Sequence, residues 1–238
     1  MTQQRFFDFG LTFVPPVTLA ADSSTALLII DMQYHDASPD QGFNLAVEQI
    51  QPGGMAYFNE RNEDVVIPAI RDLLRYFRSR ALPVIFLTLG SDYQDYRDIP
   101  PRMREWILDV EERSGVRNIF WSGNPAFAIR KEIQPLPGET IIRKHTFGAF
   151  NSSNLDQYLR DSGIRNLVIT GISTNACVET TARDAADRGW GCVMVSRGMA
   201  DYDAEAHEAT LRAFHFNFGR VVDAADEVIT AIETGKPL

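Results

Sequence analysis

The stretch that decides the fold is Val168-Ile169-Thr170-Gly171-Ile172-Ser173-Thr174-Asn175-Ala176-Cys177-Val178-Glu179-Thr180-Thr181. Its apolar start predicts a buried strand, and the Ala-, Arg- and Asp-rich segment from Thr180 to Arg188 predicts a helix after it. Cys177 therefore lies where a strand turns into a helix. The first N–H groups of a helix have no intrahelical partner and carry the positive end of its dipole. This place favours a thiolate and can hold an oxyanion. The alternative is a buried cysteine that fills space in the core.

Apolar runs without alternation predict strands at 26–30, 83–87, 140–142, 167–169, 192–195 and 220–222. Such runs are typical of parallel strands covered on both faces. Helices are predicted between them: Val66, Ile70, Leu73 and Phe77 share one helical face, and shorter helices are expected over 155–160, 204–214 and 227–233. Strands that alternate with helices predict an α/β fold with a doubly wound sheet.

The chain has 238 residues, which suits a single domain over 1–238, with residues 1–20 as an N-terminal arm. The arm carries Phe6-Phe7-Asp8-Phe9, expected to pack on its own domain or on a neighbouring subunit. A net charge of −9 argues against nucleic acid as a partner. Two cysteines are too few for a disulfide framework, and no run reaches membrane-spanning length, so we expect a cytoplasmic protein without membrane contact. No secretory signal is expected, because Asp8 and Pro15-Pro16 interrupt any apolar core.

Two long segments, 33–62 and 90–137, interrupt the strand and helix pattern. The first is polar and contains Pro52-Gly53-Gly54, and the second contains Pro100-Pro101. Long insertions at strand ends often form lids or binding loops. Contacts between subunits are the alternative.

Three chemically distinct side chains leave the predicted strand ends. Asp31 follows the first strand, Lys144 ends the third, and Cys177 follows the fourth. Because ligands of open α/β sheets bind beyond the carboxyl ends of the strands, these side chains are expected at one site. A carboxylate beside a thiol can take its proton, and a lysine beside both keeps the carboxylate ionised and favours the thiolate. Taken singly, Asp31 could cap a loop and Lys144 could be solvated.

These residues also carry a resemblance to a known family. The segments Ala26 to Gln33, Ile141 to Phe150 and Leu167 to Thr181 occur in the order and spacing of the isochorismatase-like cysteine hydrolase superfamily. The resemblance covers the chain from about residue 24 to about residue 225 and is weakest in the two insertions. It implies a three-layer α/β/α fold with a six-stranded parallel sheet, of Rossmann type.

The resemblance further implies an Asp31, Lys144 and Cys177 catalytic triad. It implies a cis peptide at Ile172-Ser173 that turns the Ser173 N–H toward the substrate, where it forms the oxyanion hole with the Cys177 N–H. Family members usually form dimers or tetramers, so a homo-oligomer is expected.

The triad bears on the type of reaction. Members with all three residues cleave C–N bonds through an acyl enzyme, whereas the vinyl-ether-hydrolysing isochorismatases use no cysteine nucleophile. The resemblance thus implies an amidohydrolase for a small amide, ureido or N-carbamoyl compound. The catalytic turn is most like that of ureidoacrylate amidohydrolases. Nicotinamidases carry a metal site with histidines after the second strand, but 87–95 holds no histidine, so no metal and no cofactor are expected. A vinyl-ether or ester hydrolase and a non-catalytic oligomeric member remain the alternatives.

Substrate contacts are predicted by position alone. Gln33 and Tyr34 follow the first strand, Tyr93 follows the second, and Phe147 and Phe150 follow Lys144. An arginine of the second insertion, Arg102 or Arg104, could clamp a substrate carboxylate, although a solvated arginine is the more common case. His35 and His145 are interpreted as structural, and Cys192 as core.

Overall fold

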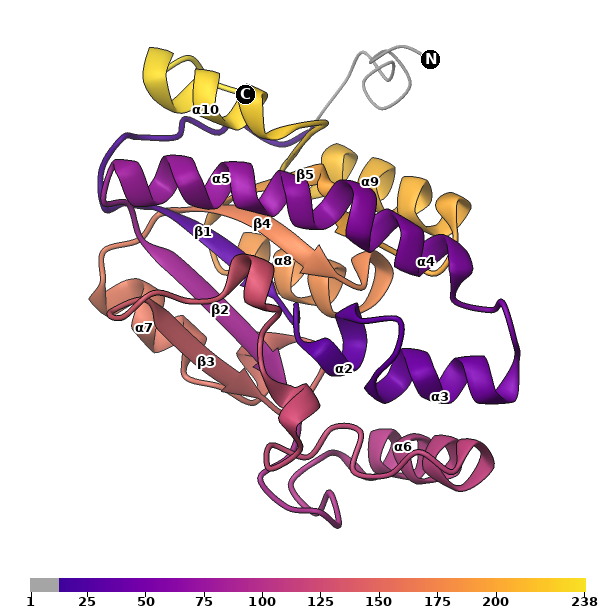
Figure 1. Ribbon diagram of the computed structural model, residues 1–238. Helices are drawn as coiled ribbons and strands as arrows, with labels where there is room; N and C mark the ends of the chain where they lie inside the picture. Colours follow the sequence, from indigo (N-terminus) through magenta and orange to yellow (C-terminus); the bar gives the residue numbers. More distant parts are fainter. Residues whose placement is uncertain (1–12) are drawn as a thin grey trace.

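The computed structural model describes residues 13–238, so Phe6-Phe7-Asp8-Phe9 and the arm up to residue 12 lie outside the described residues. The rest of the predicted arm packs on the body of the protein. The backbones of Val17 and Leu238 exchange two hydrogen bonds, of 3.2 and 2.9 Å, and Val17 and Leu19 are buried. These contacts join the two ends of the described chain at one corner of the molecule (Figure 1).

A six-stranded sheet forms the centre of the fold, as the sequence predicted. All its pairings are parallel and its order is β3-β2-β1-β4-β5-β6. The strands are β1 (Thr25–Ile30), β2 (Val84–Leu89), β3 (Thr140–Lys144), β4 (Asn166–Ile172), β5 (Gly191–Ala200) and β6 (Arg220–Val222). Every residue of β1 and β2 is buried, which explains why their sequences show no alternation. Cys192 is buried in β5, as expected.

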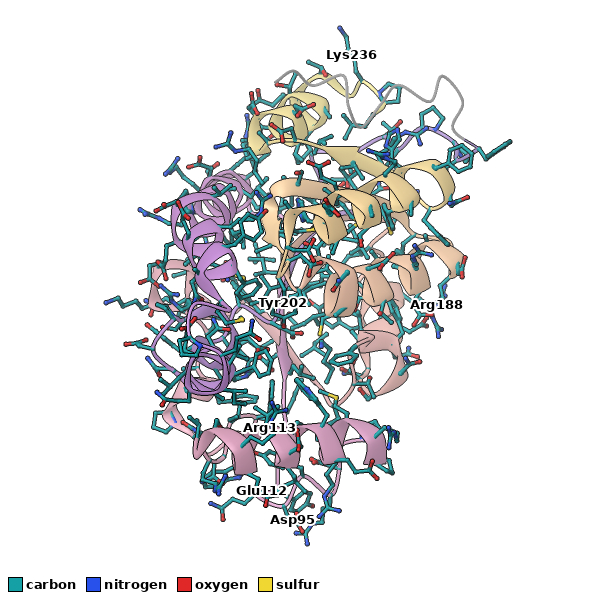
Figure 2. All side chains as sticks on the ribbon, turned by 90° about the vertical axis from the view of Figure 1, so that its right-hand side faces the viewer. Asp95, Glu112, Arg113, Arg188, Tyr202 and Lys236 are labelled. Carbon is teal, nitrogen blue, oxygen red and sulfur yellow. The ribbon has the colours of Figure 1, made fainter. Side chains whose placement is uncertain are left out.

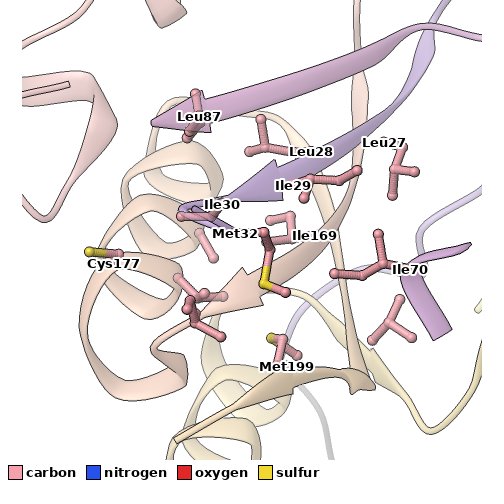
Figure 3. Close-up of a cluster of buried hydrophobic side chains, with 14 of the residues drawn as sticks. Leu27, Leu28, Ile29, Ile30, Met32, Ile70, Leu87, Ile169, Cys177 and Met199 are labelled. Carbon is pink, nitrogen blue, oxygen red and sulfur yellow. The ribbon is translucent and has the colours of Figure 1, made fainter. Parts of the chain in front are cut away.

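Helices cover both faces of this sheet, giving the three-layer α/β/α arrangement. The predicted helices appear as α5 (Ile67–Ser79), α7 (Leu155–Asp161), α8 (Glu179–Asp187), α9 (Ala204–Asn217) and α10 (Ala225–Thr234). Figure 1 shows α5 crossing one face and α8 lying behind the other. The predicted face of α5 is buried, and Figure 3 shows Ile70 reaching in from α5 toward Leu27 and Ile29.

The two insertions are more ordered than the sequence indicated. The first forms α2 (Tyr34–Ala37), α3 (Gly42–Ile50), α4 (Ala56–Arg61) and the π-helical turn η1 (Asn62–Val66), which continues into α5. The second forms α6 (Pro101–Ser114) and the 3-10 turns η2 (Pro125–Phe127) and η3 (Lys131–Ile133). Backbone hydrogen bonds from Tyr34 N to Ala128 O and from Arg130 N to Met32 O tie the two insertions together. They form one flap at the carboxyl end of the sheet (Figures 1 and 2).

Gly171 shows how the sequence fixes the end of β4. Its φ is +117°, and a Cβ built there would lie 2.1 Å from the carbonyl oxygen of Ile30. Only glycine allows β1 and β4 to approach so closely at this point. The close approach places the segment after β4 beside the end of β1.

Within residues 13–238, no helix combines the length and the apolar character needed to cross a bilayer.

Truncation of the sheet core should destabilise the protein strongly. Leu28 is fully buried between Ile85 and Ile169, so Leu28→Ala should lower the free energy of unfolding by about 2–5 kcal/mol in urea denaturation. The control is Ile141→Ala on the edge strand β3, where the side chain is 54% exposed and the loss should stay under about 1 kcal/mol. Equal losses in the two variants would contradict this description of the core.

Candidate active site

Asp31, Lys144 and Cys177 meet at the carboxyl end of the sheet. Asp31 directly follows β1, Lys144 is the last residue of β3, and Cys177 lies in the π-helical turn η5 (Thr174–Val178) that leads from β4 into α8. The Lys144 Nζ atom lies 2.7 Å from Asp31 Oδ2 and 3.3 Å from Cys177 Sγ, and it donates to Thr146 O at 3.1 Å. The ammonium thus holds the carboxylate and the sulfur on either side of itself.

All three side chains are buried, and burial dominates their ionisation. It raises the pKa of the Asp31 carboxyl, although the charge and hydrogen bond of Lys144 act the other way. Burial alone would lower the pKa of Lys144, but the charges of Asp31 and Cys177 outweigh it and raise that pKa. The 2.7 Å separation of Lys144 Nζ and Asp31 Oδ2 is that of an ion pair between an ammonium and a carboxylate.

The thiol behaves differently from the expectation. Burial raises the pKa of Cys177 well above its usual value, and the charge of Asp31 adds to the effect, while Lys144 opposes it. This raised pKa runs against the expectation that the helix N-terminus and Lys144 favour the thiolate. Full burial and a neighbouring carboxylate cost the thiolate more than one ammonium returns. Asp31 lies 2.7 Å from the same ammonium that lies 3.3 Å from the sulfur, which places it to accept the thiol proton.

The turn before Cys177 has the backbone that the resemblance implied. The Ile172-Ser173 peptide is cis. Ser173 is buried, its carbonyl accepts from Ala176 N and Val178 N, and its own N–H has no hydrogen-bond acceptor within residues 13–238. A donor without a partner at this place is available to a bound oxygen atom.

A chain of polar side chains holds this turn from behind. Arg61 donates from Nε to Met199 O at 2.9 Å and from Nη2 to Ser196 O at 3.0 Å. The same Nη2 lies 3.0 Å from His207 Nε2, which must accept because a guanidinium only donates. The His207 Nδ1–H then donates to Thr174 Oγ1 at 2.8 Å. Arg61 therefore fixes the tautomer of His207, and His207 fixes the first residue of η5.

A cavity of about 610 Å³ opens beside the three residues. Residues of α6 and the segment after β3 line it, among them Met103, Trp106, Thr146, Phe147 and Thr180. The backbone oxygen of Thr146, which lines the cavity, accepts the Lys144 hydrogen bond, and Thr180 is three residues beyond Cys177. Asp31, Lys144 and Cys177 do not themselves line the cavity. Its walls are mostly apolar, as in many small-molecule sites.

The predicted substrate-contact residues differ in where the structure places them. Phe147 is 43% exposed and lines the cavity. Tyr34 is not among the residues that line this cavity, and its hydroxyl accepts from Lys131 N at 3.2 Å. Tyr93 is also exposed, and the guanidinium of Arg97 covers its ring at 3.8 Å from the centroid.

Two of these predictions are wrong in their geometry. The Gln33 side chain is fully buried, donates to Phe127 O at 2.9 Å and accepts from Leu89 N at 2.7 Å, so both ends of its amide are occupied by backbone. Phe150 packs on Trp190, with ring centroids 5.5 Å apart, and faces the core. Position after a strand could not reveal either outcome, because it says nothing of where a side chain points.

The two arginines of the second insertion also differ in position. Arg102 lines the outer part of the cavity and pairs with Glu105 at 2.6 Å, in an exposed setting. Arg104 donates to Asp95 O at 2.6 Å and is half-buried.

Sequence reasoning missed Asp36 and Tyr202. Asp36 lies in α2, and its charge raises the pKa values of Asp31 and Cys177. Tyr202 comes two residues after β5, and its pKa is raised first by burial of the hydroxyl and then by the charge of Asp36. The rule that ligands bind beyond the carboxyl ends of strands points to Tyr202 as clearly as to Cys177.

Asp92, Asp98 and His145 form a group whose ligand atoms all lie within 4.8 Å of one another. Protein groups already occupy them. Asp98 accepts from Ser91 Oγ and from Asp92 N, Asp92 pairs with Arg143, and His145 Nδ1 lies 2.7 Å from Gly90 O. The absence of a metal stays a prediction.

Comparison with known proteins places the chain in one family. The family model described as the Isochorismatase domain matches residues 25–226. Ureidoacrylate amidohydrolase RutB of Stutzerimonas stutzeri is 34% identical over 178 residues, which cover 71% of this chain and 66% of that protein. RutB of Pseudomonas syringae pv. syringae is 29% identical over 90% of this chain and 86% of its own length. The crystal structure of a cysteine hydrolase from Pseudomonas syringae pv. phaseolicola superposes with a TM-score of 0.74, at 22% identity, over 94% of this chain and 100% of that one.

His207 should make the protein sensitive to acid. Burial and the charge of Arg61 lower its pKa from 6.5 to about 3, so the folded protein excludes a proton that the unfolded chain binds below pH 6.5. Stability from this residue is complete above pH 6.5 and is lost as the pH falls from there toward 3, at up to about 1.4 kcal/mol per pH unit. Between pH 6.5 and 5, urea denaturation should show wild type losing about 1.6 kcal/mol more than His207→Gln. Parallel losses would contradict the buried, neutral imidazole.

Proposed function

We propose that this chain, which belongs to the isochorismatase-like cysteine hydrolase superfamily, is a cysteine-dependent amidohydrolase. Its substrate is a small amide, ureido or N-carbamoyl compound, and its products are an acid and ammonia or an amine. The names of the RutB relatives, ureidoacrylate amidohydrolases, support cleavage of a C–N bond.

One observation carries this proposal: the sulfur of Cys177 lies 3.3 Å from an ammonium that is itself 2.7 Å from a carboxylate, beside a cavity. A nucleophile, a base and a charge that orients both are the parts that acyl transfer requires. Cysteine favours an acyl-enzyme mechanism over vinyl-ether hydrolysis, which needs no thiol.

In the first half of the reaction, Asp31 takes the proton of Cys177 as the sulfur attacks the substrate carbonyl carbon. The developing oxyanion accepts hydrogen bonds from the Ser173 and Cys177 backbone N–H groups, and one such donor contributes about 3–4 kcal/mol in a comparable site. Asp31 then gives its proton to the nitrogen as the C–N bond breaks, which leaves a thioester on Cys177.

In the second half, Asp31 takes a proton from water, and the resulting hydroxide attacks the thioester carbonyl. The proton returns to the sulfur as the carbon–sulfur bond breaks. Lys144 stays protonated throughout. Its ammonium pairs with the negative charge, whether Asp31 or Cys177 carries it. The charge can therefore move between these two residues without being left buried and unpaired.

Cys177→Ala should abolish turnover without loss of the fold. The assay is ammonia release from a panel of ureido acids, N-carbamoyl amino acids, biuret and simple amides, with circular dichroism as the check on folding. Cys192→Ala is the matched control, because Cys192 is buried in β5 with its Sγ 3.4 Å from Trp190 O, and it should retain activity. Full activity in Cys177→Ala would end the nucleophile assignment.

The pH dependence of kcat/KM should reflect the ionisation of the Asp31 carboxyl. Because the carboxyl must be ionised to accept the thiol proton, kcat/KM falls as the pH drops through its pKa, and burial puts that pKa above the usual 3.8. The acid limb of kcat/KM should therefore have its midpoint above pH 3.8, at pH values where fluorescence shows the protein still folded. Asp31→Asn should lose activity at every pH. Activity that stays constant down to pH 3.8 would contradict an Asp31 base.

A further inference from the structure

The pairing of β1 with β2 stops at Asp31. Up to that residue the two strands keep the regular parallel register, and Asp31 N donates to Leu87 O at 3.0 Å. One step further, the same ladder would have Leu89 N donate to Asp31 O. The chain turns away instead, because Asp31 has a φ of +55°, in the left-handed region that few residues other than glycine adopt. Figure 3 shows the two strand ends side by side.

Gln33 takes the place of the missing ladder bond. Its backbone N–H donates to Asp31 O at 2.8 Å, and its side-chain Oε1 accepts from Leu89 N at 2.7 Å. The two groups that a regular ladder would have joined are therefore each bonded to Gln33. The other end of the amide donates from Nε2 to Phe127 O at 2.9 Å, in the second insertion. A glutamine amide carries the donor and the acceptor of a peptide group, so it can replace one in a sheet.

His35 completes the replacement at the next polar group of β2. Its Nε2 lies 3.2 Å from Leu89 O and must donate to it, because a carbonyl only accepts. Both side chains are fully buried, and Leu89 is 2% exposed. Gln33 and His35 thus supply partners for both backbone polar groups of Leu89 on the side that β1 has left, where an unpaired group would be costly.

Leu89 lies between the two halves of the catalytic ion pair. On its other side it is paired with Lys144, and Gly90 N donates to Lys144 O at 3.2 Å. Asp31 therefore reaches Lys144 across the end of β2, where their side chains meet at 2.7 Å. The Gln33 amide joins the turn that carries Asp31 to the residue of β2 that is paired with Lys144.

Backbone bonds hold the same segment to the second insertion. Arg130 N donates to Met32 O, and Tyr34 N donates to Ala128 O, both at 2.9 Å. These bonds do not involve the Gln33 side chain, so the segment should stay folded without it. What the amide adds is the fixed distance between the Asp31 turn and the end of β2.

We propose that Gln33 is a positioning residue: its amide completes the sheet beside β2 and thereby sets where the Asp31 carboxylate lies relative to Lys144 and Cys177. A left-handed residue at a reactive site persists only where its surroundings hold it, and Gln33 bonds on both sides of that turn. The proposal rests on the proposed function, in which Asp31 is the base, and adds a residue that acts through Asp31 alone.

Gln33→Met tests this role, because methionine matches glutamine in length and volume but forms neither hydrogen bond. In the ammonia-release assay kcat should fall at least about tenfold, since misplacing a catalytic group by about 1 Å can cost more than that. KM should stay within about threefold, because the buried side chain is out of a substrate's reach. Gln33→Asn keeps the amide but is too short to reach both partners, so its kcat should fall as well.

A second readout needs no substrate. Thiolate absorbance is measured against pH in wild type and in Gln33→Met, each as the difference from the same protein carrying Cys177→Ala. In wild type, burial and then the charge of Asp31 raise the pKa of Cys177. A displaced carboxylate opposes the thiolate less, so in Gln33→Met the thiolate should appear at a pH lower by at least about half a unit.

The matched control is Trp190→Phe, just before β5 at the opposite end of the sheet. It also leaves a buried main-chain group unpaired, because Trp190 Nε1 donates to Ile164 O at 3.0 Å. Its loss of stability should be similar to that of Gln33→Met. Its kcat should stay within about twofold of wild type, and its thiolate titration should not shift, because neither group touches the Asp31 turn.

The outcomes separate the two proposals. In folded Gln33→Met, an unshifted thiolate titration would overturn the positioning role, whatever happens to kcat, and would leave the amidohydrolase untouched. Effects of equal size in Trp190→Phe would overturn it as well, because the loss of any buried bond would then suffice. If wild type releases ammonia from none of the compounds, the proposed function fails and the thiolate titration alone decides the role of Gln33. If Gln33→Met does not fold, Gln33→Asn takes its place in both measurements.

Discussion

The ion pair between Lys144 and Asp31 is the interaction on which the rest of the site depends. Its two atoms lie 2.7 Å apart in a place where neither side chain meets solvent. Removing one partner of such a pair leaves a buried charge and typically costs about 3–5 kcal/mol, whereas two apolar residues could fill the same space at little cost. The contribution of this buried ion pair is therefore to the chemistry of the site rather than to the stability of the fold. In this account it keeps Asp31 ionised beside a neutral thiol, so that a proton can move when a carbonyl arrives.

The sheet supplies the geometry for that pair. Asp31 and Lys144 come from strands separated by β2, and Cys177 comes from the other side of β1, so their meeting requires the order β3-β2-β1-β4 and its register. Gly171 lets β4 approach the end of β1, and the chain from Arg61 through His207 to Thr174 holds the turn that follows. The reactive residues thus lie at strand ends, while α6 of the second insertion lines the neighbouring cavity.

The sequence predicted the parts of this structure that local pattern controls. Continuous apolar runs located all six strands, and polar residues at their ends located Asp31, Lys144 and Cys177. The sequence did not predict the features that tertiary contacts determine. Gln33 is polar and follows a strand, yet its amide bonds to backbone groups of residues 89 and 127, far along the chain. The helices of 33–62 and 90–137 were missed because they are stabilised by packing on each other. The protonation of Cys177 depends on the depth of burial, which no motif encodes.

The account turns on a neutral thiol held beside an ionised carboxylate. The most direct measurement is the ultraviolet absorbance of thiolate as a function of pH, taken as the difference between wild type and Cys177→Ala so that Cys192 and the tyrosines cancel. The account predicts no thiolate signal from Cys177 at neutral pH, and its appearance only at a pH above that needed for free cysteine. A thiolate already present at pH 7 would contradict it.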